Sequence, residues 1–250
     1  MIKFLTSDFK HYHKENGKKI ANKFDNSNGI VDHIKKYLNR NNTILFIASD
    51  SKNKEKIDLY SKLLFEGLKL SGINFDDYLV LADETKNNAR EYIEQADLIF
   101  LSGGDTYVQS QFFNELKLRE LLSDFNGIII GQSAGALNMA YNVFNSPEEM
   151  EESEPIYFEG LGLTDINIEP HFTLDTSDFD ETEIYQRNKI LEESYNRKIY
   201  GQCNGSHILI TDSNTYICGR TYLIEDGKIS LMCDDKQTLE IYQNSSLLRK

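Results

Sequence analysis

Short apolar runs alternate with helical stretches over the first half of the chain, and this alternation restricts the possible folds more than any other feature. The apolar runs are typical of buried strands and cover Ile2–Thr6, Thr43–Ala48, Tyr78–Leu81, Asp97–Ser102 and Gly127–Gly131. The segments between them favour helix and cover Ile30–Leu38, Lys54–Leu70, Asn87–Gln95 and Thr106–Leu122. Such alternation predicts a three-layer α/β/α sandwich around a mostly parallel sheet. No linker or repeat divides residues 1–250, so we expect one domain.

The second half of the chain carries shorter and more varied elements. The sequence predicts a strand near Leu163–Ile168 that ends at Pro170, and a helix around Glu181–Tyr195. A closing set of short strands is expected at Ile199–Cys203, His207–Thr211, Thr215–Cys218 and Tyr222–Glu225, followed by a turn at Glu225–Lys228. The acidic run Ser146–Pro155 is expected to be a solvated loop.

Composition excludes several classes of function. The formal net charge of -13 disfavours nucleic acid and anionic membranes as partners. No apolar run is long enough to span a bilayer and the first residues are too charged for a signal peptide, so we expect a cytoplasmic protein, monomeric or homodimeric. The three cysteines, Cys203, Cys218 and Cys233, form no C-x-x-C pair, which argues against a disulfide framework or a zinc site and favours reduced, half-buried strand thiols.

A serine lies where the fifth predicted strand gives way to a helix, in the segment IIIGQSAGALNMA. Gly131 and Gly135 flank Ser133 in a G-x-S-x-G pattern, which exposes a nucleophilic hydroxyl at the carboxyl edge of a sheet. The amide of Ala134, at the helix N-terminus, is a natural donor to an oxyanion. Small residues at such a turn can also serve only helix–strand packing.

A second donor is expected from the loop Gly103-Gly104-Asp105, which follows the fourth predicted strand. Paired glycines let the backbone approach a substrate closely, although they can also serve turn geometry alone. An activated serine also needs a base, and the candidates are the five histidines.

His171 is the favoured base because it follows a predicted strand, where ligands bind in open α/β sheets. His11, His13 and His33 lie in polar, lysine-rich surroundings and are expected to be exposed, while His207 reads as an ordinary half-buried strand residue. The group that orients the imidazole stays open at this point among Asn204, Glu148, Asp165 and Asp175.

Taken together, the Gly-Gly-Asp loop, GQSAGA, EPHFT and QCNGS resemble the peptidase E family of serine peptidases, which includes aspartyl dipeptidase and the related cyanophycinases. The resemblance extends from about Thr43 to about Gly219 and implies a sheet similar to class I glutamine amidotransferases, of flavodoxin-like type. It implies that Ser133 attacks the peptide carbonyl, His171 is its base and Gly104 supplies an oxyanion amide, without metal or cofactor. Asp105 stands where the family usually has asparagine.

Two positions depart from the family pattern. Aspartyl dipeptidases place a glutamate third in the triad, and the matching residue here is Asn204, which can orient an imidazole but brings no charge. An enzyme that selects aspartate needs cationic groups, yet the segment after His171 is acidic up to Arg187. Arg187 could bind substrate together with Gly103 and Asp105, or simply pair with Glu183 at i−4 on the helix surface.

The sequence thus predicts a serine-type peptidase or amidase that hydrolyses short peptides, with amino-terminal aspartate as one candidate preference, through a Ser133-His171-Asn204 acyl-enzyme mechanism. Two alternatives remain. One is an esterase of α/β-hydrolase type with the order Ser133, Asp178, His207. The other is a non-catalytic amidotransferase-like module that binds or regulates a partner.

Overall fold

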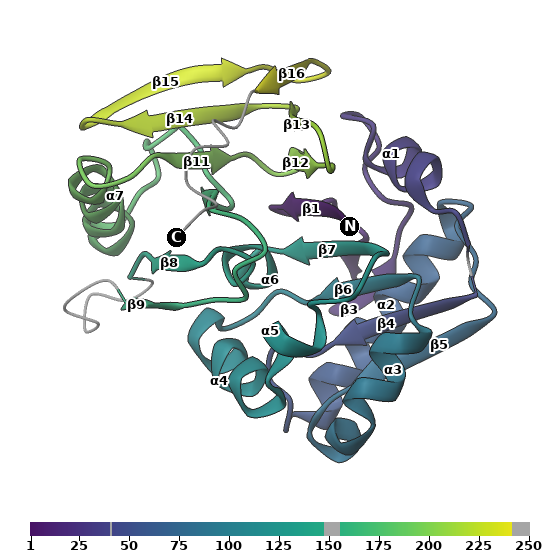
Figure 1. Ribbon diagram of the computed structural model, residues 1–250. Coiled ribbons are helices and arrows are strands. Elements are labelled where there is room, and N and C mark those ends of the chain that lie inside the picture. The colour runs from purple at the N-terminus through teal and green to yellow at the C-terminus, as the bar shows by residue number, and fades with distance from the viewer. Residues whose placement is uncertain (41, 148–155, 242–250) are drawn as a thin grey trace.

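An eight-stranded sheet forms the centre of the structure, a computed structural model that describes residues 1–40, 42–147 and 156–241 (Figure 1). In spatial order its strands are β16 (Thr238–Ile241), β13 (Thr215–Cys218), β12 (His207–Ile210), β1 (Ile2–Thr6), β7 (Ile128–Gln132), β6 (Leu98–Leu101), β4 (Thr43–Ile47) and β5 (Asp77–Leu81). The five neighbouring strands β1, β7, β6, β4 and β5 are mutually parallel. Strands β12, β13 and β16 extend this sheet next to β1, each antiparallel to its neighbour. The predicted mostly parallel central sheet is confirmed.

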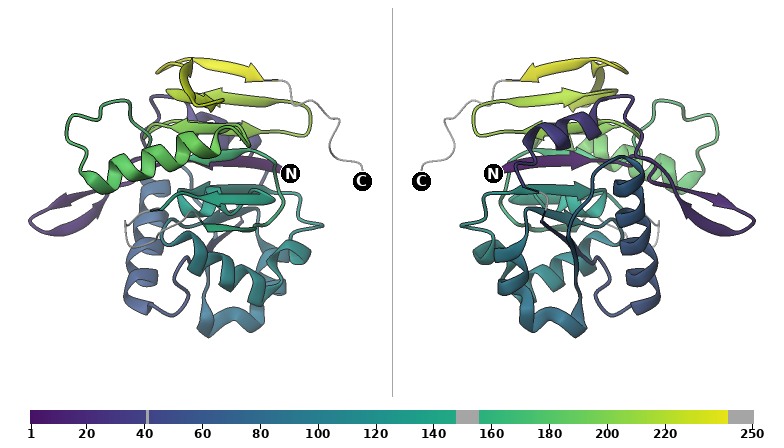
Figure 2. Two further views of the ribbon diagram at one scale, coloured as in Figure 1. Left: turned by 90° about the vertical axis from the view of Figure 1, so that its left-hand side faces the viewer. Right: turned by 90° about the vertical axis from the view of Figure 1, so that its right-hand side faces the viewer.

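Helices cover both faces of this sheet. One face packs against α1 (Ile30–Tyr37) and α2 (Lys54–Leu70), and the other against α3 (Ala89–Gln95), α4 (Thr106–Leu116), α5 (Leu118–Leu121) and α6 (Ala134–Leu137). Figure 2 shows α2 on one side of the sheet and α4 and α5 on the other. Side chains alternate between the faces along each strand, so Ile44 and Phe46 join the α2 side while Leu45 and Ile47 join the α4 side. Because both faces of the sheet are buried, side chains pointing to either face are apolar, and each strand is a continuous apolar run in the sequence.

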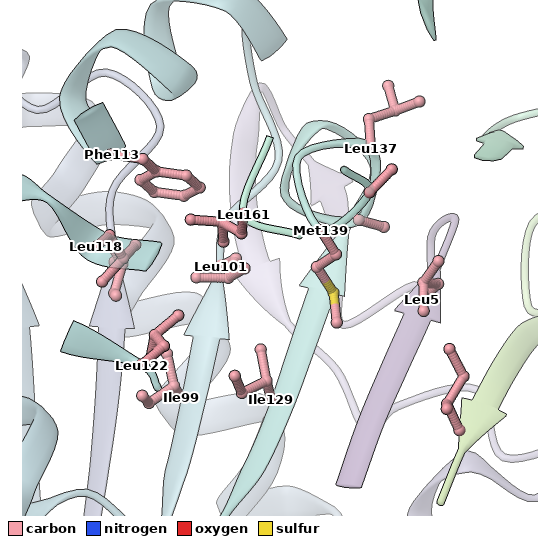
Figure 3. Close-up of a cluster of buried hydrophobic side chains, with 14 of the residues drawn as sticks. Leu5, Ile99, Leu101, Phe113, Leu118, Leu122, Ile129, Leu137, Met139 and Leu161 are labelled. Carbon is pink, nitrogen blue, oxygen red and sulfur yellow. The ribbon is translucent and has the colours of Figure 1, made fainter. Parts of the chain in front are cut away.

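The core on the α4 side fixes the position of α6 (Figure 3). Leu101, Ile129 and Met139 are fully buried there, between β6, β7 and the end of α6. A Cβ atom at Gly135 would lie 2.2 Å from the carbonyl oxygen of Leu101, so only glycine lets this short helix lie directly on β6. The turn that precedes α6 is therefore held against the sheet by close packing.

A second sheet of four strands corrects the prediction of a single closing set. Its strands, in spatial order, are β10 (Asn167–Glu169), β11 (Ile199–Gln202), β14 (Thr221–Glu225) and β15 (Lys228–Cys233). The chain thus leaves the small sheet after β11, adds β12 and β13 to the large sheet, and returns at β14. Helix α7 (Glu181–Glu193) packs on the small sheet through Ile190. The predicted strand near 163–168 forms later than expected, at β10, directly before Pro170.

Several local features differ from the sequence prediction or were missed. The hairpins β2 (Tyr12–Glu15)–β3 (Lys18–Ala21) and β8 (Asn142–Asn145)–β9 (Ile156–Glu159), and the 3-10 helix η1 (Asp83–Asn88), were not predicted. The single helix expected over 106–122 is interrupted at Lys117, whose backbone is left-handed with φ of 53°. The turn at 225–228 is confirmed, with positive φ at Asp226 and Gly227 as a tight hairpin requires.

Two further expectations concern the acidic run and the possibility of a membrane-spanning helix. Most of the acidic run, residues 148–155, lies outside the described residues. Among the helices of the described chain, none has the length and apolar character needed to cross a membrane.

We predict that Leu101→Ala lowers the free energy of unfolding by about 2–5 kcal/mol, because it leaves a cavity beneath α6 in a fully buried core. Leu59→Ala is the matched control, since Leu59 on α2 is 40% exposed and its loss should change stability by less than about 0.5 kcal/mol. Urea titration followed by circular dichroism measures both values. Equal effects of the two substitutions would contradict the packing described here.

Candidate active site

Ser133 occupies a strained turn between β7 and α6. Its backbone has φ of 48° and ψ of −112°, a combination that costs on the order of 1–3 kcal/mol for a residue with a side chain. The turn is held because the Ser133 amide donates to the Thr6 carbonyl at 2.9 Å, and the Ser133 carbonyl accepts from Ala136 and Leu137 in α6. The fold therefore places a half-buried serine hydroxyl at the carboxyl edge of the large sheet.

His171 and Asn204 come to this serine from the second sheet. His171 follows β10 after Pro170, and Asn204 lies in the turn that leaves β11, the parallel neighbour of β10. The Nε2 atom of His171 lies 3.2 Å from Ser133 Oγ, and its Nδ1 atom lies 2.8 Å from Asn204 Oδ1. An amide oxygen can only accept, so this pairing puts a proton on Nδ1 and leaves Nε2 free to accept the serine proton.

Ser7 ties these groups together and was missed by the sequence analysis. It is fully buried directly after β1, where its Oγ accepts from the backbone N–H of His171 at 2.7 Å and donates to Asn204 Oδ1 at 2.9 Å. One hydroxyl thus fixes both the main chain of the histidine and the side chain that orients its ring. The only signal in the sequence that Ser7 belongs to the site was its position at the carboxyl end of a predicted parallel strand, next to β7 in the structure.

The glycine loop after β6 borders Ser133. Gly104 has φ of 150°, and a Cβ there would lie 2.2 Å from the Oγ of Ser49, so the position admits only glycine without a shift. Ser49, which follows β4, donates to the Gly103 carbonyl at 2.8 Å and holds the loop in place. Asp105 caps α4, since its carboxylate accepts from the Val108 amide at 2.8 Å.

Two cavities adjoin the serine, and both include Gly104, Ser133 and His171 in their lining. One, of about 500 Å³, extends over the ends of β4 and β6 toward Lys56 on α2. The other, of about 600 Å³, extends between α7 and β10 to Arg187. Ser133 therefore borders both cavities.

Arg187 is half-buried in the second cavity rather than on the outer surface of α7. Its guanidinium donates to the Thr173 carbonyl at 2.6 Å and stacks 4.2 Å from the centre of the Phe172 ring. Burial lowers the pKa of Arg187 from its ordinary value, and the charge of nearby Glu169 acts in the opposite direction. Glu183, the alternative partner, belongs to the helix cap and accepts from the Asp180 amide.

Three of the other four histidines are placed differently from the sequence prediction. His13 is exposed as expected, whereas His11 is only 3% exposed and burial lowers its pKa to about 4. His33 is half-buried, and His207 is completely buried in β12 with its Nε2 3.0 Å from His33 Nδ1. The alternative esterase triad, with His207 as the base for Ser133, is therefore not formed, because the imidazole that contacts Ser133 is His171.

The family model of peptidase family S51 matches residues 18–218, which is most of the chain and includes Ser133, His171 and Asn204. The chain belongs to peptidase family S51.

Named relatives have sequences of moderate similarity. A probable alpha-aspartyl dipeptidase of Drosophila melanogaster is 29% identical over 134 residues, which are 52% of this chain and 52% of the relative. A peptidase E of Salmonella paratyphi A is 28% identical over 181 residues, 68% of this chain and 75% of the relative. The match thus spans about half the length of the Drosophila protein.

Two solved structures have a similar fold. A peptidase from an acI-B1 Actinobacterium superimposes with a TM-score of 0.69 at 14% identity, covering 96% of each chain. A putative peptidase E protein from Listeria monocytogenes EGD-e gives a TM-score of 0.58 at 21% identity, covering 86% of this chain and 96% of that one. At these identities the likeness extends to the fold, a large mostly parallel sheet between helices.

We predict that a fluorophosphonate labels Ser133, because its hydroxyl contacts an imidazole oriented to accept the proton. His171→Ala should slow labelling by about 10²–10⁴-fold, and Ser7→Ala by up to about tenfold through loss of one positioning hydrogen bond. Ser123→Ala, at an exposed serine, is the control and should not change the rate. Mass spectrometry of the labelled peptide locates the adduct, and a label elsewhere than Ser133 would refute the assignment.

Proposed function

We propose that this protein is a serine peptidase that hydrolyses short peptides through a covalent acyl-enzyme. The observation that carries the proposal is the chain of contacts from Ser133 Oγ to His171 Nε2 and from His171 Nδ1 to Asn204 Oδ1, where Ser133 and His171 line two cavities. Membership of peptidase family S51 supports the same reaction class.

In the first half of the reaction His171 Nε2 takes the proton of Ser133 as Oγ attacks the carbonyl carbon of the substrate. The developing oxyanion is bound by the amides of Gly104 and Ala134. The Ala134 amide is the first of α6, and such amides have no acceptor within the helix, which leaves it available to substrate. His171 then returns the proton to the departing amine, and the acyl group stays on Ser133.

In the second half a water molecule gives its proton to His171 Nε2 and attacks the acyl carbon. The bond from that carbon to Ser133 Oγ then breaks, His171 returns the proton to Oγ, and the acid is released. Asn204 holds the ring in one tautomer throughout, with Ser7 holding Asn204. Because an amide adds no negative charge, the imidazolium formed in each step is less stabilised than it would be beside a carboxylate. The expected turnover is therefore modest.

Arg187 makes an acidic residue the leading candidate for the amino-terminal side of the substrate. It is a half-buried cation in a cavity that reaches Ser133, and a substrate carboxylate there would gain a charge-assisted hydrogen bond. The relative from Drosophila, which is named a probable alpha-aspartyl dipeptidase, supports testing aspartyl dipeptides first. Glu169 and Glu183 line the same cavity and limit the net attraction for an anion.

We predict that the wild type cleaves members of a dipeptide panel varied at the amino-terminal residue, and that Ser133→Ala lowers kcat/KM by at least about 10³-fold. Liquid chromatography of the released amino acids measures the rate. Equal cleavage by both proteins would identify a contaminant and contradict the proposal. Peptide binding without cleavage across the panel would support the non-catalytic module instead.

Aspartyl-leucine and asparaginyl-leucine form a matched pair for charge recognition, because they differ in charge but hardly in shape. We predict that Arg187→Gln lowers kcat/KM for the aspartyl peptide by about 10–10²-fold and changes the asparaginyl value little. Arg90→Gln, at an exposed arginine of α3, is the control. An equal loss for both peptides would assign Arg187 a structural role through Thr173 and Phe172.

A further inference from the structure

Two histidines and a cysteine meet on the α1 side of the large sheet, outside the Ser133 site. His207 on β12 and Cys218 on β13 are directly opposite one another in the antiparallel register, and His33 reaches them from α1. His33 Nδ1 lies 3.0 Å from His207 Nε2, and the three potential ligand atoms all lie within 4.8 Å of one another. Within the described part of the chain, no other group of three or more histidine, cysteine or acidic residues is arranged in this way.

The surroundings of His207 give a second reason to regard this cluster as a site. The residue is completely buried, and its Nδ1 atom has no hydrogen-bond partner among the described residues. Burying an imidazole with one nitrogen unsatisfied costs stability that an apolar strand residue would avoid. The nitrogen of His207 that faces the cluster is Nε2, which contacts His33.

The chemistry of the three side chains suits a metal ion. Two imidazoles can each offer a nitrogen lone pair, and a thiol can bind as a thiolate once it has lost its proton. The Thr238 hydroxyl donates to the Cys218 sulfur at 3.8 Å, a contact that would support a thiolate.

We propose that His33, His207 and Cys218 bind a Zn²⁺ ion at a site separate from Ser133. Two imidazole nitrogens and a thiolate are ligands that zinc prefers, and with three protein ligands the fourth position of a tetrahedral site would be taken by water. Binding forms a Zn–S bond and releases the thiol proton to solvent. Tetrahedral zinc holds nitrogen and sulfur ligands about 3.6 Å apart, so the Cys218 sulfur would approach the imidazoles by up to about 1 Å while the two nitrogens separate slightly.

This proposal revises the sequence-based expectation that no zinc site is present. That expectation used the absence of a C-x-x-C pair, whereas the ligands here lie far apart along the chain, with His33 and His207 separated by 174 positions. Only the pairing of β12 with β13 and the packing of α1 on the sheet bring them together.

The site has a structural connection to the Ser133 region. His207 is paired with Thr6, the residue before Ser7, and it begins β12 three residues after Asn204. A bound ion would join α1, β12 and β13 next to the two residues that position His171. Zinc is thus expected to stabilise the fold in this region without contacting the substrate.

The test uses the full-length protein, first dialysed against a chelator and then titrated with Co²⁺ and Zn²⁺. We expect one ion per chain, a rise in melting temperature with zinc concentration, and a thiolate-to-cobalt charge-transfer band that Zn²⁺ removes. His33→Ala and Cys218→Ser should weaken zinc binding by at least about 100-fold and Cys218→Ser should abolish the band. The controls His13→Ala and Cys203→Ser, at an exposed histidine and a half-buried cysteine, should leave both unchanged.

A charge-transfer band that persists in Cys218→Ser would overturn the assignment of the ligands. If a variant fails to fold, native mass spectrometry of the wild type still tests whether zinc binds. Native mass spectrometry that finds no zinc-bound species at a tenfold excess of Zn²⁺ would mean that the three side chains form only a buried imidazole pair beside a thiol.

Discussion

The contact between the His171 imidazole and the Ser133 hydroxyl is the interaction on which the rest of the site depends, because its two members belong to different sheets. Ser133 is fixed to the large sheet through Thr6 and α6, and His171 follows a strand of the small one. The two sheets must therefore be aligned to within a fraction of an ångström. Ser7 provides that alignment, since it is anchored at the end of β1 and bonds to both groups that come from the second sheet.

Backbone strain is concentrated at the same place. Ser133 and His171 both have positive φ values, 48° and 57°, and Gly104 has φ of 150°. Non-glycine residues in such conformations each cost on the order of 1–3 kcal/mol, which only dense surroundings can hold. The close contact of Gly135 with Leu101 and the hydrogen bond of Ser49 to the glycine loop provide this support. The core of the sandwich thus stabilises the conformation that presents the nucleophile.

The sequence predicted the parallel sheet and the serine turn well, because apolar strands and small residues around Ser133 are local signals. It could not separate the late strands into two sheets, since β11 and β12 have the same length and character and differ only in their partners. Ser7 and the grouping of His33 with His207 escaped prediction for the same reason. Each depends on contacts between residues far apart in the chain, which carry no pattern in the sequence.

Nuclear magnetic resonance of protein labelled with ¹⁵N in its imidazole rings tests the central arrangement most directly. The account predicts that His171 is protonated at Nδ1 and unprotonated at Nε2 when neutral, with the Nδ1 proton protected from exchange by Asn204. Removal of the Ser133 hydroxyl should then shift the Nε2 resonance while the Nδ1 proton stays in place. A ring protonated at Nε2, or one that exchanges freely between both tautomers, would contradict the arrangement and with it the proposed role of Ser133.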